Sequence, residues 1–178
     1  MPPLSRLSPF ALATVVAVLC QPGTATSEEA TVRAYSSWEA AGTFFQTGVN
    51  EATFSGAFSG AFNVEGDDGS VEIGLIACPG MLVINKEDWS QRGTANCVIT
   101  TSDAERIYAD LECDGQYREG CTGEFTFTGG TGAYAGITGG GPIEFLNVMP
   151  NRSAVGGTQV TAEAVGLARW PTLTYQIP

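Results

Sequence analysis

The chain has 178 residues, with 8 Lys and Arg, 19 Asp and Glu and no His, and its formal net charge is −11 at pH 7. This length suggests one folded domain. Lys and Arg are not clustered anywhere, which argues against nucleic-acid binding, because phosphate contacts need grouped cations. Without His, neither a Ser-His-Asp triad nor a Cys-His dyad can form. The acidity itself is interpreted as a means of staying soluble.

The N-terminal residues have the pattern of a signal peptide. Arg6 precedes the apolar run Phe10–Leu19, which is too short to cross a bilayer, and small residues follow it up to Ser27. We therefore expect a signal peptide over residues 1–25 and an exported domain over residues 26–178, secreted or periplasmic, with no membrane span after cleavage. Cys20 lies at the depth of a lipid-modified cysteine but follows Leu19 rather than a small residue, so its lipidation stays open.

Residues Thr53–Val64 give the first clear strand. Phe54, Phe58 and Phe62 lie on one face of a period-two pattern, which is typical of a half-buried strand. The acidic stretch Glu65–Ser70 then predicts an Asp-Gly hairpin turn. Calcium binding there is not expected, because the ligand spacing of an EF-hand is absent.

The rest of the chain also favours β structure. Apolar residues alternate over 71–75 up to Cys78, and Pro79-Gly80 predicts a turn. One weak helical pattern covers Ser37–Ala41. Further strands are expected at Met81–Ile84, Ala95–Thr100, Ile107–Cys113, Ile143–Met149, Thr158–Leu167 and Trp170–Ile177. Turn signals recur about every eight to twelve residues, which indicates a sandwich or a barrel, and the many small residues favour closure into a barrel.

Four cysteines remain after removal of the signal peptide, and an even number in an exported chain indicates two disulfides. Three connectivities are open, and we expect Cys78–Cys97 and Cys113–Cys121, since a hairpin between two strands would bring Cys113 close to Cys121. A zinc site is disfavoured, because the chain lacks both CxxC spacing and His. We expect no metal and no cofactor.

The stretch Cys121–Gly141 is the most informative part of the sequence. A clean alternating strand runs into a corner dense in glycine, where Gly129 and Gly130 allow positive φ and close backbone approach. Thr131 is expected to cap a short helical turn, and Tyr134 to plug one end of the fold. A phosphate-binding loop is disfavoured, since both the GxGxxG spacing and the Walker lysine are missing.

Residues 128–139, read as TGGTGAYAGITG, resemble the strand-end signature of the allene oxide cyclase and dirigent-like β-barrel superfamily. The resemblance implies an all-β fold, a single closed antiparallel barrel of about eight strands, here stapled by disulfides. The superfamily includes isomerising cyclases, dirigent proteins that steer radical coupling, and exported bacterial proteins without a known activity. No catalytic residue of the family carries over to this chain.

By strand parity, an aromatic set faces the barrel interior. The candidate ligand-binding residues are Tyr134 and the five phenylalanines of this set, which are Phe54, Phe58, Phe62, Phe125 and Phe127. The glycines among them, Gly56, Gly60 and Gly123, either leave room for a ligand or relieve strand curvature, so a ligand cavity and a packed core both stay open.

Asp110 and Glu144 are the candidate catalytic carboxylates. A carboxyl group facing a cavity would have a raised pKa and could act as a general acid or base. The alternative is a solvated outer face, where lone acids usually lie.

The leading hypothesis is an exported barrel that binds a small apolar molecule without covalent chemistry. One alternative is a cofactor-free cyclase or isomerase that confines a reactive substrate. The other is a structural or partner-binding module with a solid core. A cavity with an inward carboxylate favours the enzyme, a cavity without one favours the binder, and no cavity favours the third. The sequence selects neither a ligand nor an oligomeric state.

Overall fold

The computed structural model describes residues 28–66, 69–154 and 159–178, and describes side chains there except for those of Glu28 and residues 148–162. The predicted signal peptide and Cys20 lie outside the described residues. The structure therefore bears on the predicted domain that follows the signal-peptide pattern.

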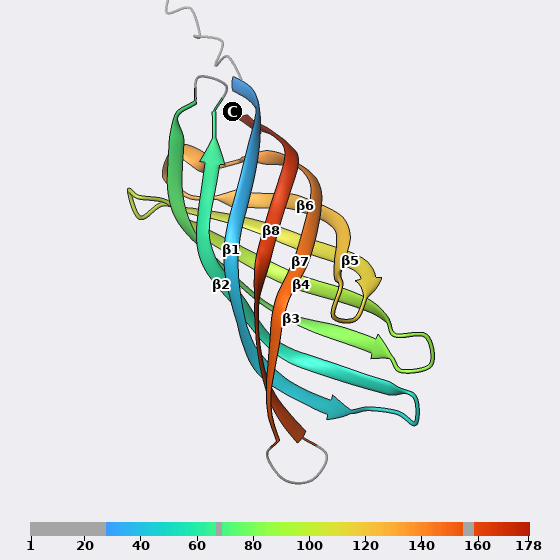
Figure 1. The fold of residues 1–178 in the computed structure, drawn as a ribbon. Helices are drawn as coiled ribbons and strands as arrows, with labels where there is room; N and C mark the ends of the chain where they lie inside the picture. Colours follow the sequence, from blue (N-terminus) through green and yellow to red (C-terminus); the bar gives the residue numbers. More distant parts are fainter. Residues whose placement is uncertain (1–27, 67–68, 155–158) are drawn as a thin grey trace, which may run out of the picture.

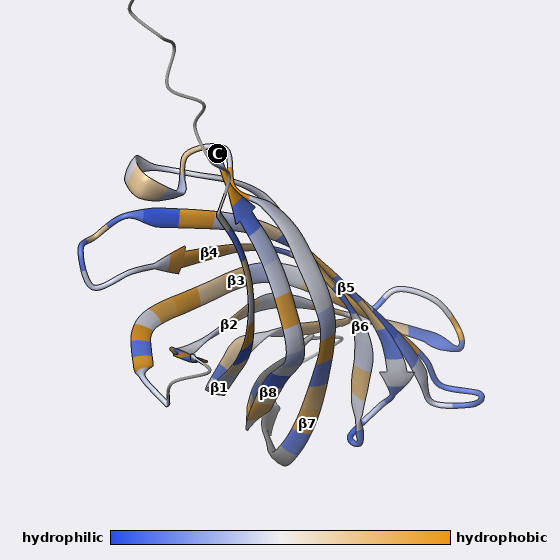
Figure 2. Cartoon of the chain, turned by 90° about the horizontal axis from the view of Figure 1, so that it is seen from above, coloured by the Kyte–Doolittle hydropathy of each residue, from blue (hydrophilic) through white to orange (hydrophobic). Residues whose placement is uncertain are grey.

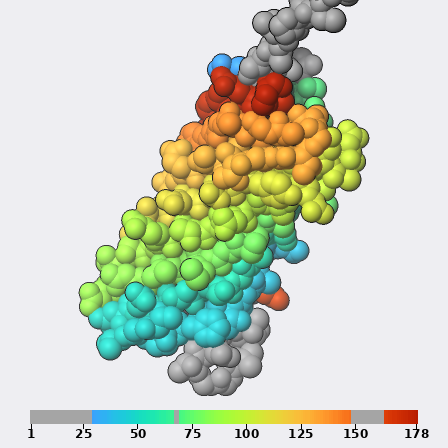
Figure 3. Space-filling view, turned by 180° about the vertical axis from the view of Figure 1, so that it is seen from behind, coloured from blue at the N-terminus to red at the C-terminus, as the bar shows by residue number. Residues whose placement is uncertain are grey.

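Eight antiparallel strands form one closed barrel in the order β1-β2-β3-β4-β5-β6-β7-β8, which confirms the predicted fold class. Their bounds are β1 Glu28–Gln46, β2 Glu51–Glu65, β3 Val71–Asn85, β4 Ser90–Thr100, β5 Arg106–Gln116, β6 Gly120–Gly130, β7 Thr138–Ala154 and β8 Gln159–Ile177, with a short 3-10 turn η1 at Gly132–Tyr134. β1 pairs with both β2 and β8, so the sheet has no free edge. The C-terminus lies near the start of β1 (Figure 1), and from behind the strands β2 to β7 follow one another in chain order (Figure 3).

Alternation along the strands creates the barrel interior. In β5, Ile107, Ala109, Leu111 and Cys113 are buried while the residues between them are exposed. This period of two is what a sheet with one covered face requires. Hydrophobic and hydrophilic residues accordingly alternate along the strands (Figure 2).

Both predicted disulfides are confirmed. Cys78 on β3 bonds Cys97 on β4, and Cys113 on β5 bonds Cys121 on β6. The first lies between the paired positions Ala77–Val98 and Gly80–Ala95 of β3 and β4, and the second closes the β5–β6 hairpin. All four sulfurs lie inside the barrel, since each of these cysteines is at most 9% exposed.

Three local expectations were wrong because barrel closure outweighs local signals. The segment Ser37–Ala41 is part of β1 and not a helix. Pro79-Gly80 lies inside β3 and makes no turn, since Pro79 still pairs with Ala57 of β2. The two strands expected on either side of Ala168 are one strand, β8.

A β-bulge at Pro171 in β8 explains why the sequence predicts two strands there. Val32 of β1 pairs with Leu173, whereas Ala34 pairs with Trp170, so β8 has one extra residue at Pro171–Thr172. A bulge tolerates a proline, because the ladder is interrupted there and needs no N–H donor.

The glycine corner is a tight connection between β6 and β7. Gly129 has φ 151° and Gly132 has φ 57°, both unfavourable for other residues. Thr131 does not cap η1 with its side chain. Its Oγ1 instead accepts the Arg106 N–H at 2.8 Å, and Glu105 Oε1 accepts the Ala133 N–H at 3.0 Å. The capping prediction was therefore wrong, because the Thr131 hydroxyl bonds the start of β5 and the Glu105 carboxylate, just before β5, supplies the acceptor for η1.

Candidate functional site

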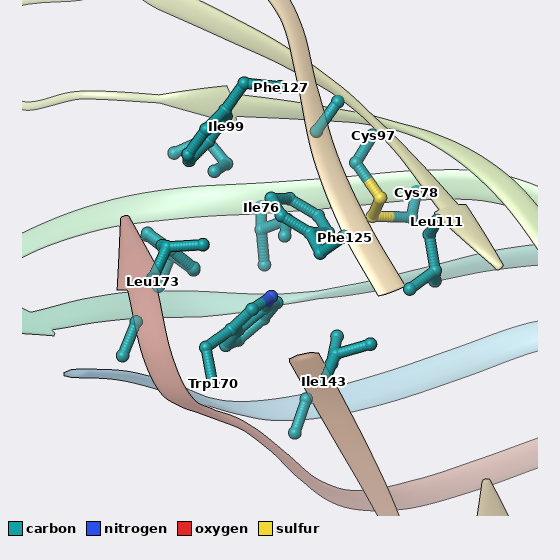
Figure 4. Packing of buried hydrophobic residues seen from close by; sticks show 14 of the residues in the cluster. Ile76, Cys78, Cys97, Ile99, Leu111, Phe125, Phe127, Ile143, Trp170 and Leu173 are labelled. Carbon is teal, nitrogen blue, oxygen red and sulfur yellow. A yellow bond between two sulfur atoms is a disulfide. The ribbon is translucent and has the colours of Figure 1, made fainter. Parts of the chain in front are cut away.

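The barrel interior divides into two parts, and the first, which we call the packed half, lies toward the glycine corner. Trp170 is fully buried and meets Phe62 and Phe125 edge to face, with ring centroids 5.0 and 5.4 Å apart. Phe125 also meets Phe127 at 5.6 Å. Leu173, Ile76 and Ile143 fill the space around Trp170 (Figure 4). This half is a solid core.

The second part, which we call the hollow half, lies toward the loops that join β1 to β2, β3 to β4 and β5 to β6. It contains a cavity of about 180 Å³ with an almost entirely apolar lining. Phe44, Phe54, Leu82 and Leu111 line its walls. An apolar cavity of this kind is the usual form of a small-molecule site.

A row of small residues explains why this half is hollow. Gly42, Gly56 and Gly80 pair directly across β1, β2 and β3, and Ala95 continues the row on β4. Four neighbouring strands thus contribute almost no side-chain volume at this level. A Cβ at Gly56 would lie 2.5 Å from the Phe54 ring, so the glycine also allows that ring to lie flat against the strand.

Three aromatic rings lie between the cavity and the packed half. Trp38, Phe58 and Phe145 all line the cavity and contact one another, with centroids 5.1 to 6.3 Å apart. A Cβ at Gly166 would lie 2.5 Å from the Trp38 ring, so the indole covers that glycine. The three rings form a firm apolar floor for the cavity.

The rim of the cavity is aromatic and held in place by several contacts. Tyr117 stacks on Trp89 with centroids 5.8 Å apart and meets Phe44 at 6.1 Å. The Tyr117 N–H donates to the Trp89 carbonyl at 2.8 Å, and the Arg118 guanidinium lies 5.8 Å from the Tyr117 ring centroid. Trp89 and Arg118 both have positive φ, 61° and 76°. A non-glycine residue in this conformation persists only where its surroundings fix it, so the rim is preorganised.

Gln91 is the buried polar side chain of the cavity wall, 6% exposed. Its Nε2 donates to the Gly120 carbonyl at 2.9 Å, which ties β4 to the start of β6. Its Oε1 and the Trp38 Nε1 have no hydrogen-bond partner within the structure. Gln91 therefore fixes β4 to β6 next to the rim, and its side chain is uncharged.

The structure separates the predicted aromatic set. Phe54 and Phe58 line the cavity. Phe62, Phe125 and Phe127 belong to the packed half, so they are inside the barrel but away from the cavity. Tyr134 packs against the same core from the glycine corner, at the opposite end from the rim. Burial raises the pKa of the Tyr134 phenol above its ordinary value, and the nearby Glu72 carboxylate adds to the shift.

The two candidate carboxylates lie on the outer surface. Asp110 is exposed and accepts the Asn96 Nδ2 hydrogen bond at 2.7 Å. Glu144 forms an ion pair with Arg169 at 2.5 Å, and its neighbours Ile143 and Phe145 point inward. Neither acid lines the cavity. Glu163 lies at the cavity edge, but it is exposed and pairs with outward-facing Ala41, so its side chain is on the outside.

Sequence reasoning missed several residues of the cavity. Trp38 and Phe44 lie on β1, where no strand was predicted, and Gly80 was assigned to a turn. The alternation of Phe44 and Gly42 with polar or small neighbours was the available signal. Gln91 carries no such signal, because a polar residue at the start of a strand is ordinarily exposed.

Within the described residues, no group of three or more Cys, Asp and Glu side chains is placed to hold a metal ion. Across the same residues, no helix has the length and apolar character to span a bilayer.

No protein-family model matches the chain, and no curated protein matches it. Among solved structures, the chain is similar to a pterocarpan synthase dirigent protein, with 10% identity over 86% of this chain and 94% of the other, and a TM-score of 0.39. The barrel assignment rests on the strand pairing described above.

Proposed function

We propose that this protein binds a small apolar molecule in the hollow half of the barrel, without covalent chemistry. The observation that carries the proposal is the cavity of about 180 Å³ between the aromatic floor and the aromatic rim. An empty apolar cavity of roughly 150 Å³ in another protein stays dry and accepts benzene. A cavity of this size and lining therefore suits a ligand of roughly six to ten non-hydrogen atoms.

The chemistry of the lining supports a binder over an enzyme. The two candidate acids, Asp110 and Glu144, lie outside, and Tyr117 and Arg118 at the rim are the titratable side chains that face the opening. General acid or base catalysis needs a titratable group within hydrogen-bond reach of the reacting atoms. The described side chains of the cavity wall can bind an apolar ligand through dispersion contacts and through the removal of apolar surface from water.

Preorganisation should help the affinity. The rim is fixed by the Trp89–Tyr117 stack, the Gln91–Gly120 hydrogen bond and the Cys113–Cys121 disulfide. A ligand then loses little free energy to ordering of the protein. For a ligand of this size we expect a Kd of about 10 μM to 1 mM.

Calorimetry with toluene, indole and naphthalene tests the proposal. We expect saturable binding of at least one of these probes with a negative heat-capacity change. The test variant is Ala95→Leu, which places a larger side chain in the glycine row and should weaken binding at least about tenfold. Folded wild-type protein that binds none of the three probes would contradict the proposal.

We also propose that the protein acts outside the cytoplasm, secreted or periplasmic. Two buried disulfides support an oxidising compartment. Mass spectrometry of protein recovered from its own source should find no free thiol among Cys78, Cys97, Cys113 and Cys121, and four reduced thiols would argue against export.

A further inference from the structure

The mouth of the cavity carries a positive charge, although the chain as a whole has a net charge of −11. Arg118 lies at the tip of the β5–β6 hairpin and is the cationic side chain among the described residues that line the cavity. Its guanidinium lies 5.8 Å from the ring centroid of Tyr117. A cation at this distance is attracted to an aromatic face, so the Tyr117 ring holds the charge beside the opening.

The charge of Arg118 is not neutralised by the side chains around it. Arg33, Arg92 and Arg169 each form an ion pair with a carboxylate. Arg118 forms no such pair with any acid that the structure describes, not even with the neighbouring Glu119. A guanidinium is a planar set of N–H donors without an acceptor. The cavity therefore opens beside donors that a ligand can use.

The backbone that positions Arg118 has an unfavourable conformation. Arg118 has φ 76°, and Trp89, in the loop that joins β3 to β4, has φ 61°. Glycine adopts positive φ at lower cost, and other residues held there cluster at ligand-binding and active sites. Trp89 stacks on the Tyr117 ring, and the Arg118 guanidinium lies over the same ring. The two turns thus place one charge and two stacked rings at one opening.

We propose that the ligand of the cavity is a small apolar acid, with one ring or one branched chain inside the barrel and a single carboxylate bound by Arg118 at the rim. This inference rests on the proposed function and adds the chemical class of the ligand. A guanidinium matches a carboxylate through two parallel hydrogen bonds. Burial of a charge without a partner is costly, so the carboxylate stays at the opening, where Arg118 is exposed.

The charge at the mouth favours a carboxylate over a phosphate ester. A chain with a net charge of −11 repels anions, and the repulsion grows with the charge of the anion. Arg118 balances one negative charge, whereas a phosphate monoester carries roughly 1.5 to 2 negative charges at pH 7. Among the described residues of the cavity wall, no second cation lies beside Arg118 to balance the rest. A monoanion therefore fits this mouth better than a dianion.

Calorimetry at low ionic strength with 3-phenylpropanoate and its neutral amide, 3-phenylpropanamide, tests the inference. The two probes share one apolar body and differ in charge. We expect the wild-type protein to bind the acid about three- to tenfold more tightly than the amide, as is typical of a partly exposed ion pair with charged hydrogen bonds.

Variants of two arginines assign the preference for the acid. Arg118→Gln should reduce the ratio of the two affinities to about one, and Arg118→Lys should keep part of it, because lysine retains the charge but not the planar set of donors. Arg92→Gln is the matched control with the same change in net charge. Arg92 pairs with Asp114 on the outer surface, so this variant should keep the ratio of the wild-type protein.

An NMR titration of the wild-type protein that follows the arginine Nε–H signals keeps the inference testable if Arg118→Gln does not fold. The acid should shift the Arg118 signal saturably and more than the amide does. The signals of Arg33 and Arg169, which are paired with carboxylates, should not move. An Arg118 signal that the bound acid leaves in place would contradict the proposed contact.

Other outcomes would also overturn the inference. If the amide binds as tightly as the acid, the cavity takes apolar molecules without regard to charge, and the proposed function still stands. If Arg118→Gln keeps the preference, or Arg92→Gln loses it equally, the preference does not come from Arg118. Tighter binding of phenyl phosphate than of 3-phenylpropanoate would assign the mouth to phosphate esters. Failure of both probes and of toluene, indole and naphthalene would remove the proposed function as well.

Discussion

The packed half and the hollow half of this barrel are built from the same strands with the same alternation, and they differ in the residues that face inward. Toward the glycine corner, Phe62, Phe125 and Trp170 are buried and pack edge to face. Toward the rim, the row Gly42, Gly56 and Gly80 leaves a cavity of about 180 Å³. The packed core and the proposed binding site are thus separated along the barrel axis, so we expect that each can be altered without the other.

The largest expected effect is on stability in the packed half. Phe125→Ala should lower the free energy of unfolding by about 4 kcal/mol, because a fully buried ring is replaced by a cavity. Phe54→Ala, in the hollow half, should cost only about 1 kcal/mol, since its ring is half-buried and already borders empty space. Urea denaturation measures both, and equal losses would mean that the two halves do not differ.

Loss of a disulfide should follow in size. Replacing both Cys78 and Cys97 by Ala removes a crosslink with a sequence separation of 19, and should cost about 3 kcal/mol. Replacing Cys113 and Cys121, separated by 8 residues, should cost about 2.5 kcal/mol and should also weaken ligand binding, because this bond pins the hairpin that carries Tyr117. Thermal denaturation measures the stability of the two double variants, and calorimetry measures their ligand binding. Equal losses of binding in both would contradict the expectation that only the Cys113–Cys121 bond supports the site.

Enlarging one alanine in each half separates packing from binding. Ala109→Leu introduces three carbon atoms into the packed half, where Ala109 is 2% exposed, and should cost about 2 kcal/mol through overpacking. Ala95→Leu places the same atoms in the cavity and should change stability by less than about 1 kcal/mol.

The same two variants should differ in their effect on binding. Ala95→Leu should weaken indole binding at least about tenfold, whereas Ala109→Leu should retain it. The idea of separate halves fails if Ala95→Leu unfolds the protein or if Ala109→Leu alone abolishes binding.

The smallest effect concerns pH. Burial raises the pKa of Tyr134 in the folded protein, so the folded state holds this proton more tightly than the unfolded state. The corresponding stabilisation is fully present below the ordinary tyrosine pKa of about 10 and is lost as pH rises through the folded pKa. Urea denaturation at pH 9 and pH 11 should show a smaller pH-dependent loss in Tyr134→Phe than in the wild-type protein. An identical loss in both would show that this phenol does not contribute.

Much of the fold could be predicted from the sequence. The alternation of apolar and polar residues and the spacing of the cysteines can both be seen within short segments, and both are typical of a closed barrel with disulfides. Phe54 to Phe62 on β2 and Cys113 to Cys121 on the β5–β6 hairpin are examples. β1 was missed, since small or polar inward residues such as Ser36 and Gly42 interrupt the apolar pattern that Trp38 and Phe44 begin. The continuity of β3 and β8 was also missed, because pairing across the barrel overrides the proline signals.

The candidate site was only half accessible to sequence reasoning. Parity places five phenylalanines inside the barrel but gives no position along the axis, so Phe54 and Phe58 could not be distinguished from Phe125 and Phe127. The axial position depends on the register between strands, which aligns Gly42, Gly56 and Gly80. That register is a property of the closed sheet and not of any single strand.

The most direct test of the account is an NMR titration with indole that follows methyl groups in both halves. We predict saturable shift changes for Leu82, Ala95 and Leu111, which line the cavity, and none for Ile99 and Leu173 in the packed half. Absence of any saturable change, or changes confined to Leu75 and Leu167 on the outer surface, would contradict a binding site inside the barrel.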